Sequence, residues 1–430
     1  MTSTTHILYG QTLGFHADPF HSDLKDAVEW HRNGAVVLKD GKIAEVGPAE
    51  RITPPEGAIA HHYGDHLIMA GFIDAHLHYP QTAMIASWGK RLIDWLNTYT
   101  FPEEAKFAAP DYAEEIAKRY FDLALAHGTT CSVSYATIHP ASVEAYFKEA
   151  QRRGLRALTG KTCMDRNAPP TLRDTAQSAY DDSKALLEKW HGVDRLGYVI
   201  TPRFSPTSSD AQLEALGALW AEHPDCLMQT HLSEQLEEIE WVRSLFPEAR
   251  DYLDTYETYG LLGERGLYGH AIHLEAREKD RLAEHGAALI HCPTSNTFIG
   301  SGLFDMAGLK AEGQRVGLAT DTGGGSSFSM LRTMAAAYEI SQLRGIALHP
   351  AQLLWLATCG SAAALHLGDR IGNLASGQEA DLIILDLTST EAISQRHAMA
   401  DDLWEAVFPT IMMGDDRAIH AVWTGGAQAL

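Results

Sequence analysis

Cysteines and basic residues are scarce in this chain of 430 residues. The cysteines are odd in number, far apart and without any C-x-x-C spacing, which argues against a disulfide framework and against a structural zinc knuckle. They are Cys131, Cys163, Cys226, Cys292 and Cys359. Lys and Arg total 34 against 56 Asp and Glu, and no segment gathers basic residues as a nucleic-acid surface requires. We therefore expect a protein of a reducing compartment that does not bind nucleic acid.

Long apolar runs are also missing. No uncharged apolar run reaches the roughly 18 residues of a membrane-spanning helix, and the N-terminal segment lacks the basic stretch and apolar core of a signal peptide. Apolar residues make up 45% and charged residues 21%, which is the composition of a globular protein. The sequence therefore predicts a soluble cytoplasmic protein with no membrane partner.

From residue 68 onward, short apolar and β-branched runs alternate with longer amphipathic segments, a pattern typical of repeated βα units. The strand-like runs are 68–76, 129–137, 155–161, 196–204, 225–231, 266–272, 287–292 and 316–321. Because parallel strands need right-handed crossover connections, eight such units close most economically as a (β/α)8 barrel of the TIM type.

The flanks of this region carry strands of a different kind. Segment 34–47 holds two strand-like runs around Asp40-Gly41, a strong hairpin signal, and segments 372–388 and 418–426 are again strand-like. Neither flank is large enough for a core of its own, so we expect both chain ends to form one small β-sandwich module. The predicted units are residues 1–67, 68–371 and 372–430.

Metal-ligand residue types follow several of the predicted strands. His76 and His78 end the first run, His231 ends the fifth, and Asp321 ends the eighth. The histidine pair alone is weak evidence for a metal site, since 22 histidines in 430 residues produce about one such spacing by chance. The two histidines could equally be solvated loop residues. All four positions, however, fall at the barrel end where active sites lie. They suit one divalent ion such as Zn²⁺, with Fe²⁺ or Mn²⁺ also open.

Several longer segments resemble the guanine deaminases of the amidohydrolase superfamily. The segments are 71–104, 161–169, 201–209, 291–305 and 414–419. The resemblance covers nearly the whole chain and implies a metal at the top of a distorted barrel with an appended β module. Two-metal members bridge their ions with a lysine at the end of strand four. This chain has no lysine between Leu196 and Phe204, so the resemblance implies one ion per chain.

The resemblance also implies a reaction. Guanine and water would give xanthine and ammonia, in purine catabolism or salvage, by a protein that forms a homodimer. The metal would activate the water. Glu234, three residues beyond His231, would carry a proton to the ring and to the departing amine. His270 and Asp321 would orient the water and stabilise the tetrahedral centre at C2.

A set of residues is expected to contact the substrate: Gln81, Trp88, Leu96, Arg203, Phe204, Glu234 and His270. By the resemblance, Gln81 and Arg203 face the base. The planar donors of Arg203 suit the carbonyl oxygen O6 and disfavour the amine that adenine carries there. Trp88 and Leu96 are candidates for the wall of a planar pocket, although such residues at helical spacing are as often plain core.

Two other functions remain open from the sequence. The first is a deaminase of the same superfamily that acts on another ring, such as a pterin or a triazine. The second is a metal-free barrel kept as a scaffold. A scaffold should have lost its ligands, whereas this chain retains His76, His78, His231 and Asp321.

Overall fold

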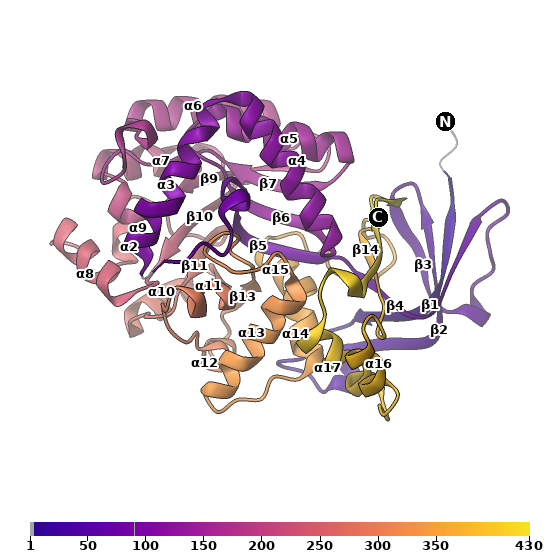
Figure 1. The fold of residues 1–430 in the computed structure, drawn as a ribbon. Helices are drawn as coiled ribbons and strands as arrows, with labels where there is room; N and C mark the ends of the chain where they lie inside the picture. The colour runs from indigo at the N-terminus through magenta and orange to yellow at the C-terminus, as the bar shows by residue number, and fades with distance from the viewer. Residues whose placement is uncertain (1–3, 90) are drawn as a thin grey trace.

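Eight parallel strands form a nearly closed barrel in the computed structural model, which describes residues 4–89 and 91–430 (Figure 1). In chain order the barrel strands are β5 (Phe72–His78), β6 (Thr129–Tyr135), β7 (Arg156–Gly160), β9 (Leu196–Pro202), β10 (Leu227–Leu232), β11 (Gly266–His270), β12 (Ala288–His291) and β13 (Arg315–Leu318). Backbone hydrogen bonds join the first strand to the chain after the last one: Asp321 N donates to His76 O at 3.0 Å and His78 N to Thr322 O at 2.6 Å. The predicted barrel is confirmed.

Helices cover the outside of the barrel (Figure 1). The longer ones are α4 (Pro110–Ala126), α5 (Pro140–Arg153), α6 (Ala176–Trp190), α7 (Asp210–Glu222), α8 (Leu236–Leu245), α10 (Ala276–Glu284), α13 (Met330–Leu343) and α17 (Leu403–Met413). Shorter helices include α2 (Leu92–Trp95), α3 (Phe101–Glu104), α9 (Asp254–Glu257), α11 (Pro293–Phe298), α12 (Met306–Ala311), α14 (Pro350–Trp355), α15 (Ser361–Ala364) and α16 (Glu391–His397). In α4, Ile116, Tyr120 and Leu125 are buried, which is the apolar stripe that anchors the helix to the barrel.

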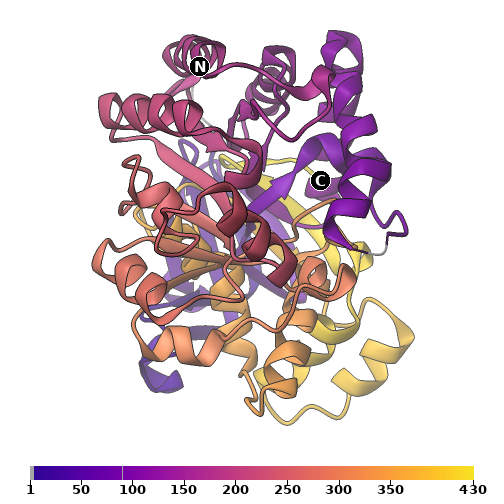
Figure 2. The same cartoon turned by 90° about the vertical axis from the view of Figure 1, so that its left-hand side faces the viewer.

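Both ends of the chain build a second sheet beside the barrel. Its seven strands run in the order β16-β15-β14-β4-β1-β2-β3. Their bounds are β1 (His6–Phe15), β2 (Val28–Lys39), β3 (Lys42–Pro48), β4 (Ile59–Ala70), β14 (Leu382–Leu385), β15 (Ile419–Thr424) and β16 (Ala427–Gln428). The indigo and yellow strands lie together to one side in Figure 1 and behind the barrel in Figure 2. A terminal module made from both chain ends is therefore confirmed.

The predicted strand 68–76 is in fact two strands, and treating it as one was wrong. β4 continues to Ala70 in the terminal sheet, and β5 begins at Phe72 in the barrel. Between them, a Cβ on Gly71 would lie 2.2 Å from Thr130 Oγ1, so only glycine permits this close passage. The end of β4 and the whole of β5 are buried, so both are mostly apolar and the sequence shows one continuous apolar run across the boundary. The boundary after residue 67 stays a prediction, and β4 runs through it.

Apolar side chains fill the barrel interior below the site. Ile73, Val133, Val199, Leu267 and Ile290 belong to one buried cluster, and they come from β5, β6, β9, β11 and β12. Because this layer is packed, the polar residues at the carboxyl ends of the strands form the floor of the barrel mouth. Among the described residues, no helix combines the length and apolar character that crossing a bilayer requires.

Candidate active site

Three histidines and one aspartate meet at the barrel mouth. His76 and His78 end β5, His231 lies on β10, and Asp321 follows β13. The Nε2 atoms of His78 and His231 are 3.2 Å apart. Asp321 Oδ1 lies 3.5 Å from His78 Nε2 and 3.6 Å from His76 Nε2. All four side chains are buried, so their polar atoms face one another rather than solvent.

The protonation of these groups fits a cation. Burial, and then the neighbouring histidines, lower the pKa values of His76, His78 and His231 well below the ordinary value, so each imidazole is neutral. His231 Nδ1 lies 2.7 Å from Arg203 O, which holds the proton on Nδ1 and leaves Nε2 as a lone-pair donor. His76 Nε2 is buried without a hydrogen-bond partner in residues 4–89 and 91–430. Neutral nitrogens beside one carboxylate are the donor set of a catalytic divalent ion.

Asp321 completes this donor set. Burial raises the pKa of Asp321 to about 7. The electrostatic interaction with His270 partly opposes this increase, because it favours the ionised form. A cation at the site would favour ionisation further, because opposite charges attract strongly in a buried environment. The residues present therefore fit the divalent metal that the sequence predicts.

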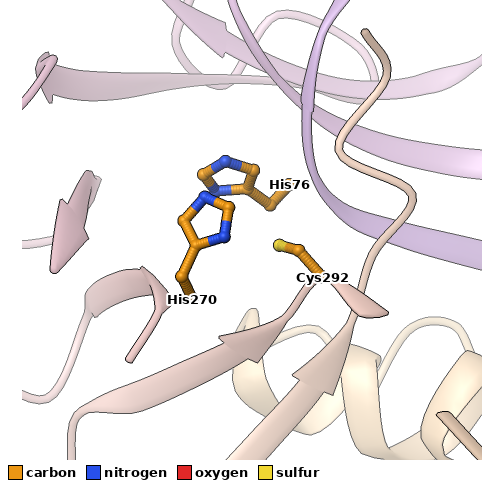
Figure 3. A group of neighbouring side chains, drawn as sticks. All are labelled: His76, His270 and Cys292. Atoms are coloured by element: carbon orange, nitrogen blue, oxygen red, sulfur yellow. The ribbon is translucent and has the colours of Figure 1, made fainter. Parts of the chain in front are cut away.

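Cys292 is a neighbour of this group that sequence analysis did not place at the site. It follows β12, and a donor atom from each of His76, His270 and Cys292 lies within 4.8 Å of the others (Figure 3). Burial raises the pKa of the Cys292 thiol well above its ordinary value, and its Sγ lies 3.6 Å from Ile290 O. A protonated thiol is a poor metal ligand, so we do not count Cys292 among the proposed ligands.

Glu234 and His270 lie beside the proposed ligands. His270 Nδ1 is 2.9 Å from Asn296 Oδ1, so Nδ1 carries the proton and Nε2 faces the site. That Nε2 lies 3.6 Å from Glu234 Oε2 and 3.8 Å from Asp321 Oδ2. Burial raises the pKa of Glu234 to about 7, while Ser301 Oγ donates to Glu234 Oε1 at 2.7 Å. A carboxyl group with this pKa can both take and return a proton at neutral pH.

The backbone at these strand ends is unusual. Ser233, His270, Ala271 and Asp321 all have positive φ, with values of 48°, 67°, 47° and 49°. Such conformations cost of the order of 1 kcal/mol each for non-glycine residues and recur at ligand sites. Glu238 stabilises the first bend, because its Oε2 accepts the N–H of Glu234 at 3.0 Å.

A pocket opens above these residues. Its lining includes Gln81, Leu92, Trp95, Leu96, Arg203, Phe204, Glu234, His270 and Asp321. Four residues that were expected to contact the substrate therefore line the same pocket as the proposed catalytic groups: Gln81, Leu96, Arg203 and Phe204.

Trp88 does not line this pocket. Its side chain is 74% exposed, whereas Trp95 is buried and forms part of the wall. A Cβ on Gly89 would lie 2.6 Å from Trp95 Cδ1, so the loop carrying Trp88 passes over Trp95 and leaves Trp88 outside. Trp88 lies in the loop before α2 and Trp95 ends α2, so the packing of this loop decides which tryptophan reaches the pocket.

Glu104 is a buried residue at this site that sequence analysis missed. It ends α3, and its carboxylate accepts hydrogen bonds from Arg203 Nη1 at 2.6 Å, Arg203 Nη2 at 3.1 Å and Gln81 Nε2 at 2.9 Å. The sequence carries only an indirect indication of Glu104. A buried arginine requires an acidic partner, and Glu104 is the last residue of segment 71–104, which resembles the guanine deaminases.

Comparison with known proteins agrees with the geometry. A model described as the amidohydrolase family matches residues 67–428. The chain is 40% identical to a guanine deaminase of Escherichia coli over 94% of this chain and 92% of that protein. A solved structure of E. coli guanine deaminase superposes with a TM-score of 0.96 over 99% of both chains, at 38% identity. A guanine deaminase of C. acetobutylicum with bound guanine in the active site superposes at 0.90, at 28% identity, over 99% of this chain and 100% of that one.

Proposed function

The chain belongs to the amidohydrolase family and catalyses the hydrolytic deamination of guanine, and we propose that it does so with one Zn²⁺ ion held by His76, His78, His231 and Asp321. As an enzyme it is a hydrolase of the C–N bonds of cyclic amidines. The observation that carries the metal proposal is the convergence of three neutral, buried imidazoles on one carboxylate.

We assign the proton transfers to Glu234. When bound, the ion would supply the Lewis acidity that makes a water molecule ionise near neutral pH. Glu234 takes one proton of that water and delivers it to N3 of guanine, where xanthine keeps it; it then carries the second water proton, from the hydroxyl now on C2, to the amine, which leaves as ammonia. Its pKa of about 7 supports both steps, and the Ser301 hydroxyl holds its other oxygen.

His270 and Asp321 act beside Glu234 in this proposal. The contact with Asn296 fixes the His270 ring, so that Nε2 is directed at the space between the two carboxylates. A polar group held in this position stabilises charge that develops when C2 becomes tetrahedral, without reorganisation during the reaction.

The pocket walls support a planar substrate. Trp95, Leu96 and Phe204 provide apolar faces, and Arg203 and Gln81 provide polar atoms at one side. We assign Arg203 to O6 of guanine, since its fixed donors pair with a carbonyl oxygen. Adenine would place an amine there and leave donors facing donors, which disfavours adenine by several kcal/mol.

We further propose that the protein acts in the cytoplasm, in purine catabolism, as a homodimer, with units at 1–67, 68–371 and 372–430. The cysteine content supports a reducing compartment. Fe²⁺ would fit the same donors, because geometry and availability rather than affinity alone select among such metals.

Turnover with metal analysis tests the proposal. The protein should release ammonia and xanthine from guanine, contain about one divalent ion per chain, and lose activity on chelation while the circular dichroism spectrum stays unchanged. Readdition of Zn²⁺ should restore activity. A pterin and a triazine serve as comparison substrates. Full turnover by verified metal-free protein would contradict the metal assignment.

A further inference from the structure

Glu104 is a fully buried carboxylate that joins two substrate-facing side chains. It ends α3, whereas Gln81 lies in the turn after β5 and Arg203 follows β9. The preceding residue, Glu103, faces elsewhere, because its carboxylate bonds Lys106 and Tyr112. Glu104 therefore connects three separate segments at the pocket wall.

The contact with Glu104 determines which end of the Gln81 amide faces the pocket. An ionised carboxylate accepts hydrogen bonds and donates none, so the amide NH2 must be the group that faces Glu104 Oε1, at 2.9 Å. The other end of the amide, Gln81 Oε1, is buried and has no hydrogen-bond partner in the described part of the chain. A buried acceptor without a partner is costly, and one that belongs to a pocket-lining residue is placed to accept an N–H of a ligand.

The same carboxylate fixes Arg203. The two terminal nitrogens of the guanidinium donate to the two oxygens of Glu104, a paired geometry that sets the plane of the group. The centre of the guanidinium also lies 5.6 Å from the ring centroid of Phe101. Nη1 also lies 3.9 Å from Met164 Sδ, so two of the five N–H donors of the arginine remain for a ligand at the pocket wall.

We propose that Glu104 is the specificity-determining residue of the pocket: by holding Gln81 as an acceptor and Arg203 as a donor, it selects a ring that presents an N–H beside a carbonyl oxygen. Guanine has this pattern at N1 and O6. In 2,6-diaminopurine the pattern is reversed, with an acceptor at N1 and an amine at C6. Glu104 is thus a positioning residue that acts through its two partners, and the inference rests on the proposed function.

Glu104→Gln is the variant that tests this role. The amide of the new glutamine has almost the same shape as the carboxylate of Glu104, but it can donate a hydrogen bond to Gln81 Oε1. The Gln81 amide can then rotate by half a turn and present its NH2 group to the pocket. The efficiency kcat/KM on guanine should fall about 10- to 100-fold, because a site left with the wrong polarity discriminates against its substrate. The inhibition constant of 2,6-diaminopurine, measured against guanine, should stay the same or improve.

A matched control is available next to it. Glu103→Gln removes the adjacent carboxylate, which touches Lys106 and Tyr112 and does not line the pocket. This variant should keep the guanine to 2,6-diaminopurine preference of the wild type. Metal content, measured on all variants, should not change.

A merely structural role predicts a different result. If Glu104 only supported the fold, Glu104→Gln would weaken guanine and 2,6-diaminopurine equally, and that outcome overturns the proposal. Should Glu104→Gln fail to fold, Glu104→Asp decides: it keeps the charge beside Arg203 but is one methylene too short to hold Gln81 as well, so the preference should still fall. An unchanged preference in folded, metal-replete Glu104→Asp overturns the proposal.

The outcomes also separate this inference from the function on which it rests. If the wild type releases no ammonia from guanine, the function fails. If the wild type turns over guanine and Glu104→Gln keeps the wild-type preference, only the role of Glu104 fails.

Discussion

Burial sets the chemistry of Glu234, because it raises the pKa of this carboxyl to about 7. Replacing it by glutamine keeps its shape and its contact with Ser301 but removes the proposed proton carrier. The kcat on guanine should therefore fall at least about 10²-fold, with metal content unchanged. Activity assays with metal analysis check this. A variant that loses its ion but keeps its activity per bound metal would show that Glu234 supports the ion instead.

The pH profile reports on the same group. Burial raises the pKa of Glu234 to about 7, above the ordinary value of a glutamate, so the carboxylate becomes protonated as the pH falls through 7. In the proposed mechanism Glu234 must be ionised to take the first proton, so kcat/KM of the wild type should decrease below about pH 7. The residual activity of Glu234→Gln should lack this decrease. If the variant shows the same acid limb, another group is responsible.

Arg203 is the residue that we propose to recognise O6, and it also forms a buried ion pair with Glu104. Removing its charge would leave a buried carboxylate unpaired, so Arg203→Lys is a better test than Arg203→Ala. Lysine keeps the charge but lacks the planar fork. We expect kcat/KM on guanine to fall about tenfold or more, and the preference for guanine over 2-aminopurine, which lacks O6, to decrease. An unchanged preference would show that Arg203 does not read O6.

At the scale of elements, α7 shows packing that overrides helix propensity. Gly217 lies inside this helix, where alanine is ordinarily preferred by about 1 kcal/mol. A Cβ at this position, however, would lie 1.8 Å from the carbonyl oxygen of Tyr259. Gly217→Ala should therefore lower the free energy of unfolding by about 1 to 3 kcal/mol, the usual cost of overpacking.

Ala218→Gly is the control for this prediction. Ala218 is the exposed neighbour of Gly217 on the same helix, so its replacement should cost only the propensity difference of about 1 kcal/mol. Denaturant unfolding of the two variants measures both values. A more stable Gly217→Ala variant would mean that the helix can move away from Tyr259.

At the scale of the whole molecule, a partly buried ion network joins the barrel to the terminal sheet. Glu379, in the segment before β14, bonds Arg156 of β7 and Arg195, and Arg195 also bonds Asp381. Glu379→Gln leaves part of this positive charge uncompensated, and because Glu379 is partly buried we expect the free energy of unfolding to fall by about 1 to 3 kcal/mol. Glu264→Gln, which removes an exposed partner of Arg315, should cost less than about 1 kcal/mol.

The network also predicts a pH dependence. Burial alone would raise the pKa of Glu379, but the hydrogen bonds and charges of Arg156 and Arg195 outweigh burial and hold the pKa below its ordinary value. The stabilisation is therefore complete above the pKa of unfolded glutamate, about 4.3, and is lost as the pH falls through the lower folded value. Acid unfolding should be less steep in Glu379→Gln than in the wild type. Identical acid transitions would contradict this.

The sequence by itself determined the architecture and the positions of the proposed metal-ligand residues. The alternation of apolar runs and amphipathic segments is local, so it predicts eight βα units, and the chain places His76, His231 and Asp321 directly after apolar runs. Because the carboxyl ends of parallel strands meet at one face, residues in these positions come together without further information. The Asp40-Gly41 hairpin is local in the same way, and both of its residues have positive φ.

Only the tertiary structure decided which side chains surround that centre. Arg203 meets Glu104 although 99 residues separate them, and neither local periodicity nor composition encodes such a pair. The choice of Trp95 over Trp88 depends on how one loop packs, and the division of the run 68–76 depends on the passage of Gly71 against Thr130. Local patterns specify where a strand or helix forms. The partners of a buried polar group are set by contacts between distant segments, and these exist only once the barrel has closed.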